Sequence, residues 1–260
     1  MTASPYPPHG ISLSQLSIGH KIPIFKGIDA QLSGGRLTGL FGRNGIGKST
    51  LLRSIAGLQA AFGGEIHIDG QTLLRLKPSD IARKLSFVPS QPLRPTRLSV
   101  ADMVGLGRYG FTNWMGHLGP EDIAAVNQAL ALTGLSALAQ QEAASLSDGE
   151  LQRASIARSL VQDTPLILLD EPTAFLDMAN KFKVVQLLQS LSREQGKGIL
   201  FSTHDLSLAL QVCDQLWIMD DSGFYADTPA QLIAQGVFTN LFAHDGLVFD
   251  EAVMTYKIGS

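Results

Sequence analysis

The chain has 260 residues, a length that fits one large domain or a core with an inserted subdomain. Hydrophobic residues make up 45% of it and charged residues 17%, which is typical of a globular protein. The formal net charge of -3 excludes the strongly basic surface of a nucleic-acid-binding protein, so nucleic acid is not an expected partner. Cys213 is the only cysteine, which excludes an internal disulfide and favours a reducing compartment; we expect a buried apolar residue there.

Residues 1–10 are rich in proline and lack the basic start and apolar run of a signal peptide. No stretch approaches the roughly eighteen uninterrupted apolar residues of a membrane-spanning helix. We therefore expect a chain that is soluble or peripheral to a membrane.

The chain is predicted to begin with strands. Residues 11–18 alternate apolar and small polar side chains with a period of two, and a second strand pair is expected over residues 22–32. Residues 36–41 form a short apolar run typical of a buried strand. Residues 49–56 then favour a helix, which Gly57 is expected to end.

A helical insertion is predicted in the middle of the chain. Residues 64–71 indicate a strand with an Asp-Gly hairpin turn, residues 78–85 a helix and residues 85–89 another strand. Residues 120–133 carry apolar side chains at helical spacing. We interpret residues from about 92 to 160 as mostly helical.

The last third indicates an α/β fold. Residues 165–170 form a continuous apolar strand that ends in a carboxylate, residues 181–193 a helix, and residues 198–204 a further buried strand. Strands that alternate with helices predict a mainly parallel sheet. Because ligands bind at the carboxyl ends of such strands, Asp170 and His204 are expected to lie at the binding edge.

The stretch that follows residue 41 fits the phosphate-loop pattern G-x-x-x-x-G-K-[ST]. Its glycines allow backbone N–H groups to curl around a phosphate at the N-terminus of the next helix. Lys48 can reach the outer phosphates, and the Ser49 hydroxyl can bind Mg²⁺. The predicted nucleotide-binding residues of this stretch are Gly42, Arg43, Asn44, Gly45, Ile46, Gly47, Lys48, Ser49 and Thr50.

The order of motifs along nearly the whole chain resembles that of ABC transporter ATPases. Gln91 stands where that family has its Q-loop glutamine, and residues 146–153 (LSDGELQR) stand where its LSGGQ signature belongs. Asp170 and Glu171 resemble the Walker B carboxylate and the catalytic glutamate. Two further matches are the D-loop residue Asp177 and the switch histidine His204.

The resemblance implies one ABC ATPase domain over residues 1–260. Its α/β P-loop NTPase core, with a mainly parallel sheet and an N-terminal antiparallel β subdomain, would comprise about residues 1–91 and 161–260. The helical subdomain, with the signature motif, would span about residues 92–160.

The resemblance also implies an ATP-hydrolysing site that uses ATP and Mg²⁺. Phosphoryl transfer to water needs charge neutralisation and an aligned nucleophile more than covalent help. The implied catalytic residues are Lys48, Gln91, Glu171 and His204, and the implied metal ligands are Ser49, Gln91 and Asp170. Glu171 would act on the attacking water and His204 would donate to the γ-phosphate. Taken alone, Glu171 is more simply explained as a surface cap and His204 as a satisfied histidine at a strand end.

The signature region has capping-box spacing, so Ser147 is predicted to cap a helix that begins near Asp148. The resemblance implies that Ser147, Gly149 and Asp177 face ATP held by a second, head-to-tail copy of the chain. Asp148 replaces the first signature glycine and Glu150 the usual glutamine. Because a carboxylate repels a triphosphate, we expect Asp148 to point away from the nucleotide.

His20 stands near the family's adenine-stacking position, with Phe25 close by, although His20 could also be a plain turn residue. Gly107-Arg108-Tyr109 resembles a motif of ATPases that serve ferric-siderophore, haem and cobalamin importers, and Gly236-Val237-Phe238 in the tail is similar to that group. Phe111, Trp114 and Met115 are candidates for an apolar contact patch or for plain burial.

The function implied is ATP hydrolysis that powers import of an iron chelate, haem or cobalamin. The region after Gln91 would contact integral membrane permease subunits at the cytoplasmic face of the inner membrane, with a solute-binding protein as an indirect partner. The alternatives are an ABC exporter subunit and a non-transport ABC ATPase that acts on nucleic acid. The latter usually carries a long coiled coil and basic surfaces, which this sequence lacks.

Overall fold

The structure is a computed structural model that describes residues 9–110, 118–241, 247–251 and 253–258. The contact patch predicted at Phe111, Trp114 and Met115 lies outside the described residues. Among the residues described, none of the helices combines the length and hydrophobicity needed to cross a bilayer.

A six-stranded sheet forms the centre of the molecule, in the order β10-β9-β3-β8-β7-β6. All neighbouring pairs are parallel except β9 and β10, which confirms the prediction of a mainly parallel sheet. The strands are β3 (Leu37–Gly42), β6 (Leu85–Val88), β7 (Leu166–Leu169), β8 (Gly198–Thr203), β9 (Gln215–Asp220) and β10 (Gly223–Asp227).

Both faces of this sheet are covered, and the side chains of its strands alternate between two cores. In β7, Leu168 packs into one core, while Ile167 and Leu169 pack into the other. Burial on both faces explains the continuous apolar runs in the sequence, because neither face of these strands meets water.

An antiparallel sheet and one helix cover the first face. The sheet has the order β2-β1-β4-β5, with β1 at Gly10–Gly19, β2 at Pro23–Ser33, β4 at Gly63–Ile68 and β5 at Gln71–Thr72. Asp69 and Gly70 have φ angles of 51° and 74°, so the predicted Asp-Gly hairpin turn is present. Helix α1 (Lys48–Ile55) packs into the core between the two sheets, through Leu51, Leu52 and Ile55.

The second face is covered by helices α6 (Met178–Gln195) and α7 (Leu206–Val212) and by the C-terminal region. That region consists of α8 (Pro229–Ala234), α9 (Val237–Leu241), β11 (Leu247–Asp250) and β12 (Thr255–Ile258). Helix α6 begins before the predicted residue 181 because the Asp177 side chain caps it by accepting from the Asn180 N–H, at 2.8 Å.

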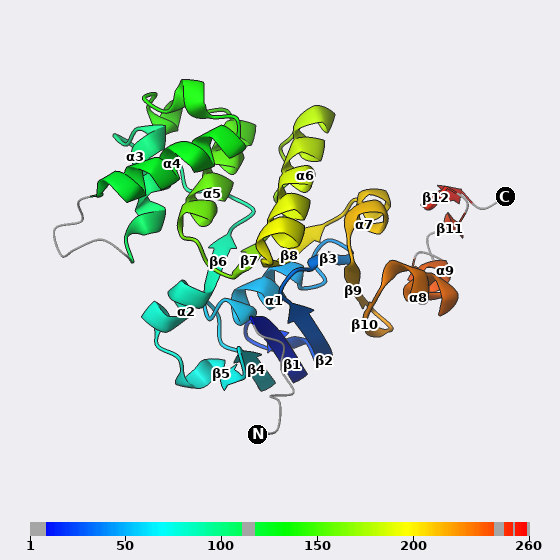
Figure 1. Ribbon diagram of the computed structural model, residues 1–260. Coiled ribbons are helices and arrows are strands. Elements are labelled where there is room, and N and C mark those ends of the chain that lie inside the picture. Colours follow the sequence, from blue (N-terminus) through cyan, green and yellow to red (C-terminus); the bar gives the residue numbers. More distant parts are fainter. Residues whose placement is uncertain (1–8, 111–117, 242–246, 252, 259–260) are drawn as a thin grey trace.

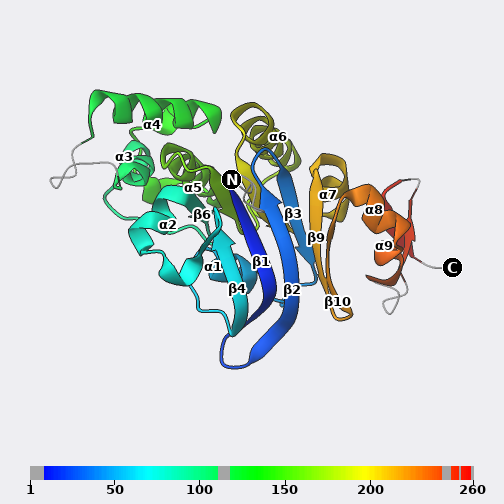
Figure 2. The same ribbon diagram turned by 60° about the horizontal axis from the view of Figure 1, so that its bottom comes forward.

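Helices α3 (Val100–Gly105), α4 (Pro120–Leu132) and α5 (Asp148–Val161) gather on one side of the molecule, opposite the C-terminal region (Figures 1 and 2). They share a core of their own, which includes Val104, Leu130 and Ala157. Helix α2 (Pro78–Lys84) leads into β6. The helical character predicted for this part of the chain is thus present.

Candidate active site

The phosphate loop joins β3 to α1, and at two of its positions the backbone geometry requires glycine. Gly47 caps α1 with a φ of 118°, a conformation that side-chain-bearing residues rarely adopt. A Cβ on Gly42 would lie only 2.6 Å from the Met219 backbone oxygen. The loop therefore passes close to β9 and turns directly into the helix N-terminus, where backbone N–H groups attract anions.

Lys48 is the first residue of α1, and its side chain turns back over the loop. Its Nζ donates to the Gly42 oxygen at 2.7 Å and to the Arg43 oxygen at 3.1 Å. Burial lowers the pKa of Lys48, and the nearby carboxylates Glu171 and Asp170 oppose that shift. The structure thus brings the predicted phosphate-binding lysine and the two predicted acidic residues to one site.

Asp170 follows β7, and Ser202 on the neighbouring strand β8 orients it. The Ser202 hydroxyl donates to Asp170 Oδ1 at 2.8 Å and accepts from the Glu171 backbone N–H at 2.8 Å. Sequence reasoning missed Ser202. A polar residue inside an otherwise apolar strand was the available signal, because a buried hydroxyl needs a partner.

The other carboxylate oxygen of Asp170, Oδ2, is buried and has no hydrogen-bond partner among the described residues. A buried ionised oxygen without a partner is costly, so it marks a place where a cation would be stabilising. Ser49 lies half-buried in the first turn of α1. Hydroxyl and carboxylate oxygens are the ligands that Mg²⁺ prefers, so these residues fit a magnesium ion.

Glu171 and His204 meet at the same edge of the sheet, beyond the ends of β7 and β8. His204 Nδ1 lies 3.9 Å from Glu171 Oε2, and both side chains remain partly exposed. Glu171 has a φ of 47°, an uncommon conformation for a non-glycine residue that is often found at functional sites.

Gln91 lies in the exposed segment that follows β6, the neighbour of β7. The Asp170 N–H donates to the Val88 oxygen at 2.8 Å, which ties the end of β6 to the acidic pair. Gln91 therefore follows a strand end that lies beside Asp170, although the Gln91 side chain itself is exposed.

The signature region forms the N-terminus of α5, with Ser147 as its cap. The Ser147 N–H donates to Glu150 Oε2 at 2.9 Å, and the Glu150 N–H donates to the Ser147 hydroxyl at 3.3 Å, as the capping-box spacing predicts. The Glu150 carboxylate accepts from both the hydroxyl and the backbone N–H of Ser147, and these two hydrogen bonds hold the pKa of Glu150 below its usual value. A pocket of about 400 Å³ is lined by Ser147, Asp148, Gly149, Glu150, Arg153, Phe175, Leu176, Asp177 and Asn180.

His20 is exposed, and its Nε2 lies 3.5 Å from the Thr50 hydroxyl in the first turns of α1. Its neighbour Phe25 packs edge-to-face on Phe224, with ring centroids 6.5 Å apart. His20 therefore lies beside the phosphate-loop helix, and Phe25 packs against the core to which that helix contributes Leu51 and Leu52.

The chain is similar to a known protein family and to several of its members. The family described as ABC transporter matches residues 25–174. The achromobactin transport ATP-binding protein CbrD of Dickeya dadantii (strain 3937) is 38% identical over 237 residues, which covers 90% of this chain and 88% of the relative. The iron(3+)-hydroxamate import ATP-binding protein FhuC of Bacillus subtilis (strain 168) is 36% identical over 202 residues, which covers 77% of this chain and 75% of the relative.

A solved structure supports the same grouping. The ATP-binding cassette MJ0796, solved as a dimer in a post-hydrolysis state with ADP and Pi, has a TM-score of 0.75 to this chain. Sequence identity is 26%, and the match covers 84% of this chain and 98% of that one. The chain therefore belongs to the ABC transporter family, in which it is an ATP-binding subunit with ATPase activity.

Proposed function

We propose that this chain is the ATP-hydrolysing subunit of an importer that takes up an iron(3+) chelate through a membrane permease. The observation that carries this proposal is the similarity, over most of both chains, to relatives named for achromobactin transport and iron(3+)-hydroxamate import. The Gly107-Arg108-Tyr109 motif favours the same group of importers.

ATP would bind with its phosphates against the loop over residues 42–47, where backbone N–H groups and the Lys48 ammonium offset their charge. Ser49, Asp170 and Gln91 would hold Mg²⁺. The ion supplies further charge neutralisation at the phosphate oxygens when it is bound. The buried, unpartnered Asp170 Oδ2 supports this assignment.

Glu171 would orient the attacking water and take its proton, and His204 would donate to the γ-phosphate. Their side chains lie near each other at the end of the sheet, which supports a shared task. General-base assistance of this kind contributes about 10²- to 10⁴-fold to a rate. His20, beside Thr50, would contact the adenine ring.

Two copies of the chain would bind head to tail around two ATP molecules. The pocket at Ser147, Gly149 and Asp177 is not lined by residues of the phosphate loop. Within one copy, the phosphate loop and the signature region therefore do not share this pocket. A second copy would bring its Ser147 and Asp177 to the ATP held by the first. The dimer would lie on the cytoplasmic face of the inner membrane, where the region after Gln91 contacts the permease and a solute-binding protein delivers the cargo.

The variant Glu171→Gln tests the catalytic assignment. We expect it to bind ATP with unchanged affinity, to lose multiple-turnover hydrolysis by about 10²-fold or more, and to accumulate as an ATP-bound dimer. Phosphate release and sedimentation velocity measure the two effects. Hydrolysis at the parent rate in this variant would remove Glu171 from the proposed role.

The cargo is tested with the complete importer, after co-purification of the permease and the solute-binding protein. Vesicles that contain the complex should accumulate a ferric hydroxamate when ATP is enclosed with the chain, but neither haem nor cobalamin. Accumulation of haem or cobalamin instead would contradict the iron(3+)-chelate assignment and leave the ATPase assignment intact.

A further inference from the structure

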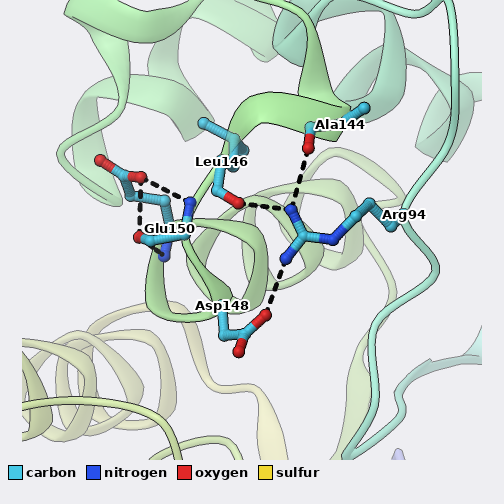
Figure 3. A network of polar contacts seen from close by, with 6 residues as sticks. Arg94, Ala144, Leu146, Asp148 and Glu150 are labelled. Carbon is cyan, nitrogen blue, oxygen red and sulfur yellow. Dashed lines mark hydrogen bonds and ion pairs between the residues drawn. The ribbon is translucent and has the colours of Figure 1, made fainter.

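Arg94 lies in the loop between β6 and α3, and its guanidinium group contacts the segment that forms the N-terminus of α5 (Figure 3). Its Nη1 donates to the backbone oxygens of Ala144, at 3.0 Å, and Leu146, and its Nη2 donates to Asp148 Oδ1 at 2.7 Å. The three acceptors flank Ser147 on both sides.

We propose that Arg94 is a positioning residue whose main task is to neutralise Asp148 as the triphosphate held by a second copy approaches the N-terminus of α5. The inference rests on the ATP-dependent dimer proposed above. It explains how the chain tolerates a carboxylate beside Ser147, which the sequence motif alone leaves unexplained.

The helix does not need Arg94 in order to begin. The capping box of Ser147 and Glu150 is complete by itself, and a carboxylate in the first turn already favours the positive end of a helix. The effect of these carboxylates on an anionic ligand is the opposite, because Asp148 and Glu150 both repel phosphate oxygens. Arg94 provides a positive charge directly on the more exposed of these two groups.

The ion pair between Arg94 and Asp148 is expected to contribute little to folding. The Arg94 side chain is 39% exposed and that of Asp148 is 71% exposed, and an exposed ion pair stabilises a fold by about 0–1 kcal/mol. Loss of Arg94 should therefore leave the chain folded and weaken dimer closure. Since only arginine has a planar fork of donors, Arg94→Lys keeps the charge but not all three hydrogen bonds.

The experiment measures ATP-dependent dimerisation of the full chain by sedimentation, with Glu171→Gln in every variant so that hydrolysis does not intervene. We expect Arg94→Ala to weaken the dimer about tenfold, Arg94→Lys to retain most of the affinity, and Asp148→Asn alone to change it less than about threefold. In the double variant Arg94→Ala/Asp148→Asn the affinity should return close to that of the parent.

Three further tests distinguish an effect of charge from general damage to the fold. ATP binding to the dilute monomer, followed with a fluorescent ATP analogue, should be the same in all variants because Asp148 would act on the other copy's nucleotide. Arg97→Ala removes a positive charge from the same loop without touching Asp148 and should dimerise like the parent. The loss of dimer affinity in Arg94→Ala should also become smaller at high salt, because salt screens an exposed carboxylate.

A double variant as weak as Arg94→Ala would overturn the inference, since the bonds to the backbone oxygens would then explain the loss. So would an Arg94→Ala variant that dimerises like the parent, or an Arg97→Ala variant that is equally weakened. A parent protein that stays monomeric with ATP contradicts the proposed dimer itself, so the two failures are distinguishable.

Discussion

Ser202 holds Asp170 and Glu171 together from a neighbouring strand. Its hydroxyl donates to the Asp170 carboxylate and accepts from the Glu171 backbone N–H, both at 2.8 Å. One hydroxyl therefore orients the carboxylate and fixes the backbone where Glu171 takes its positive φ. The two acidic side chains are adjacent in the chain, but a residue 31 positions beyond Glu171 sets their geometry.

Ser202→Ala is expected to lower the ATPase turnover number by about tenfold while ATP binding is retained. The substitution leaves the buried Asp170 carboxylate and the Glu171 N–H each without a partner, which costs about 1–3 kcal/mol of folding stability as well. Steady-state phosphate release and urea unfolding measure the two effects.

Ser86→Ala provides the matched control. Ser86 is also a buried serine of this sheet, in the edge strand β6, but its hydroxyl has no hydrogen-bond partner among the described residues. Loss of that hydroxyl should leave the turnover number unchanged. An equal loss of activity in both variants would show that any buried serine of this sheet has the same effect.

Ser147→Ala and Ser99→Ala remove two similar helix caps. Ser99 caps α3 through a capping box with Asp102, as Ser147 caps α5 with Glu150. Each substitution should cost about 1 kcal/mol of stability, measured by urea unfolding. Only Ser147→Ala should weaken ATP-dependent dimerisation, because only that hydroxyl would face the nucleotide of the second copy. Equal effects of both variants on the dimer would contradict that assignment.

The buried Lys48 should give the apo protein a pH-dependent stability. Burial lowers its pKa below 10.5 in the folded chain, so between the folded pKa and 10.5 the unfolded chain binds more protons. Folding stability therefore rises with pH in that window. The free energy of unfolding of the wild type, minus that of Lys48→Met, should increase as the pH is raised toward 10.5. A difference that is independent of pH, in urea titrations of both proteins, would contradict this.

Gly64 and Gly63 are adjacent glycines with opposite tolerance for a side chain. A Cβ on Gly64, where φ is 77°, would lie 2.3 Å from the Gln15 backbone oxygen, whereas a Cβ on Gly63 would have no atom within 4 Å. Gly64→Ala should destabilise the fold by about 3 kcal/mol or more, and Gly63→Ala by less than about 1 kcal/mol. Thermal unfolding of the two variants distinguishes them, and similar midpoints would show that β1 and β4 can separate at this point.

Local patterns in the sequence determined much of the architecture. The alternating residues of β1, the apolar runs of β7 and β8, the Asp-Gly turn and the Ser147 cap were all predictable. Each depends on hydrogen bonds or burial within a few residues, so a short stretch contains the necessary information. The phosphate loop belongs to the same class, because its glycines, lysine and helix are contiguous.

Tertiary structure alone decided the partners of Asp170 and Asp148. Which hydroxyl meets Asp170 depends on β8 lying next to β7, and which cation meets Asp148 depends on the path of the loop after β6. Arg94 and Asp148 are 54 residues apart, and nothing in either local stretch marks them as a pair. Strand order and loop path follow from burying the whole set of apolar faces at once, which is a property of the complete chain rather than of any segment.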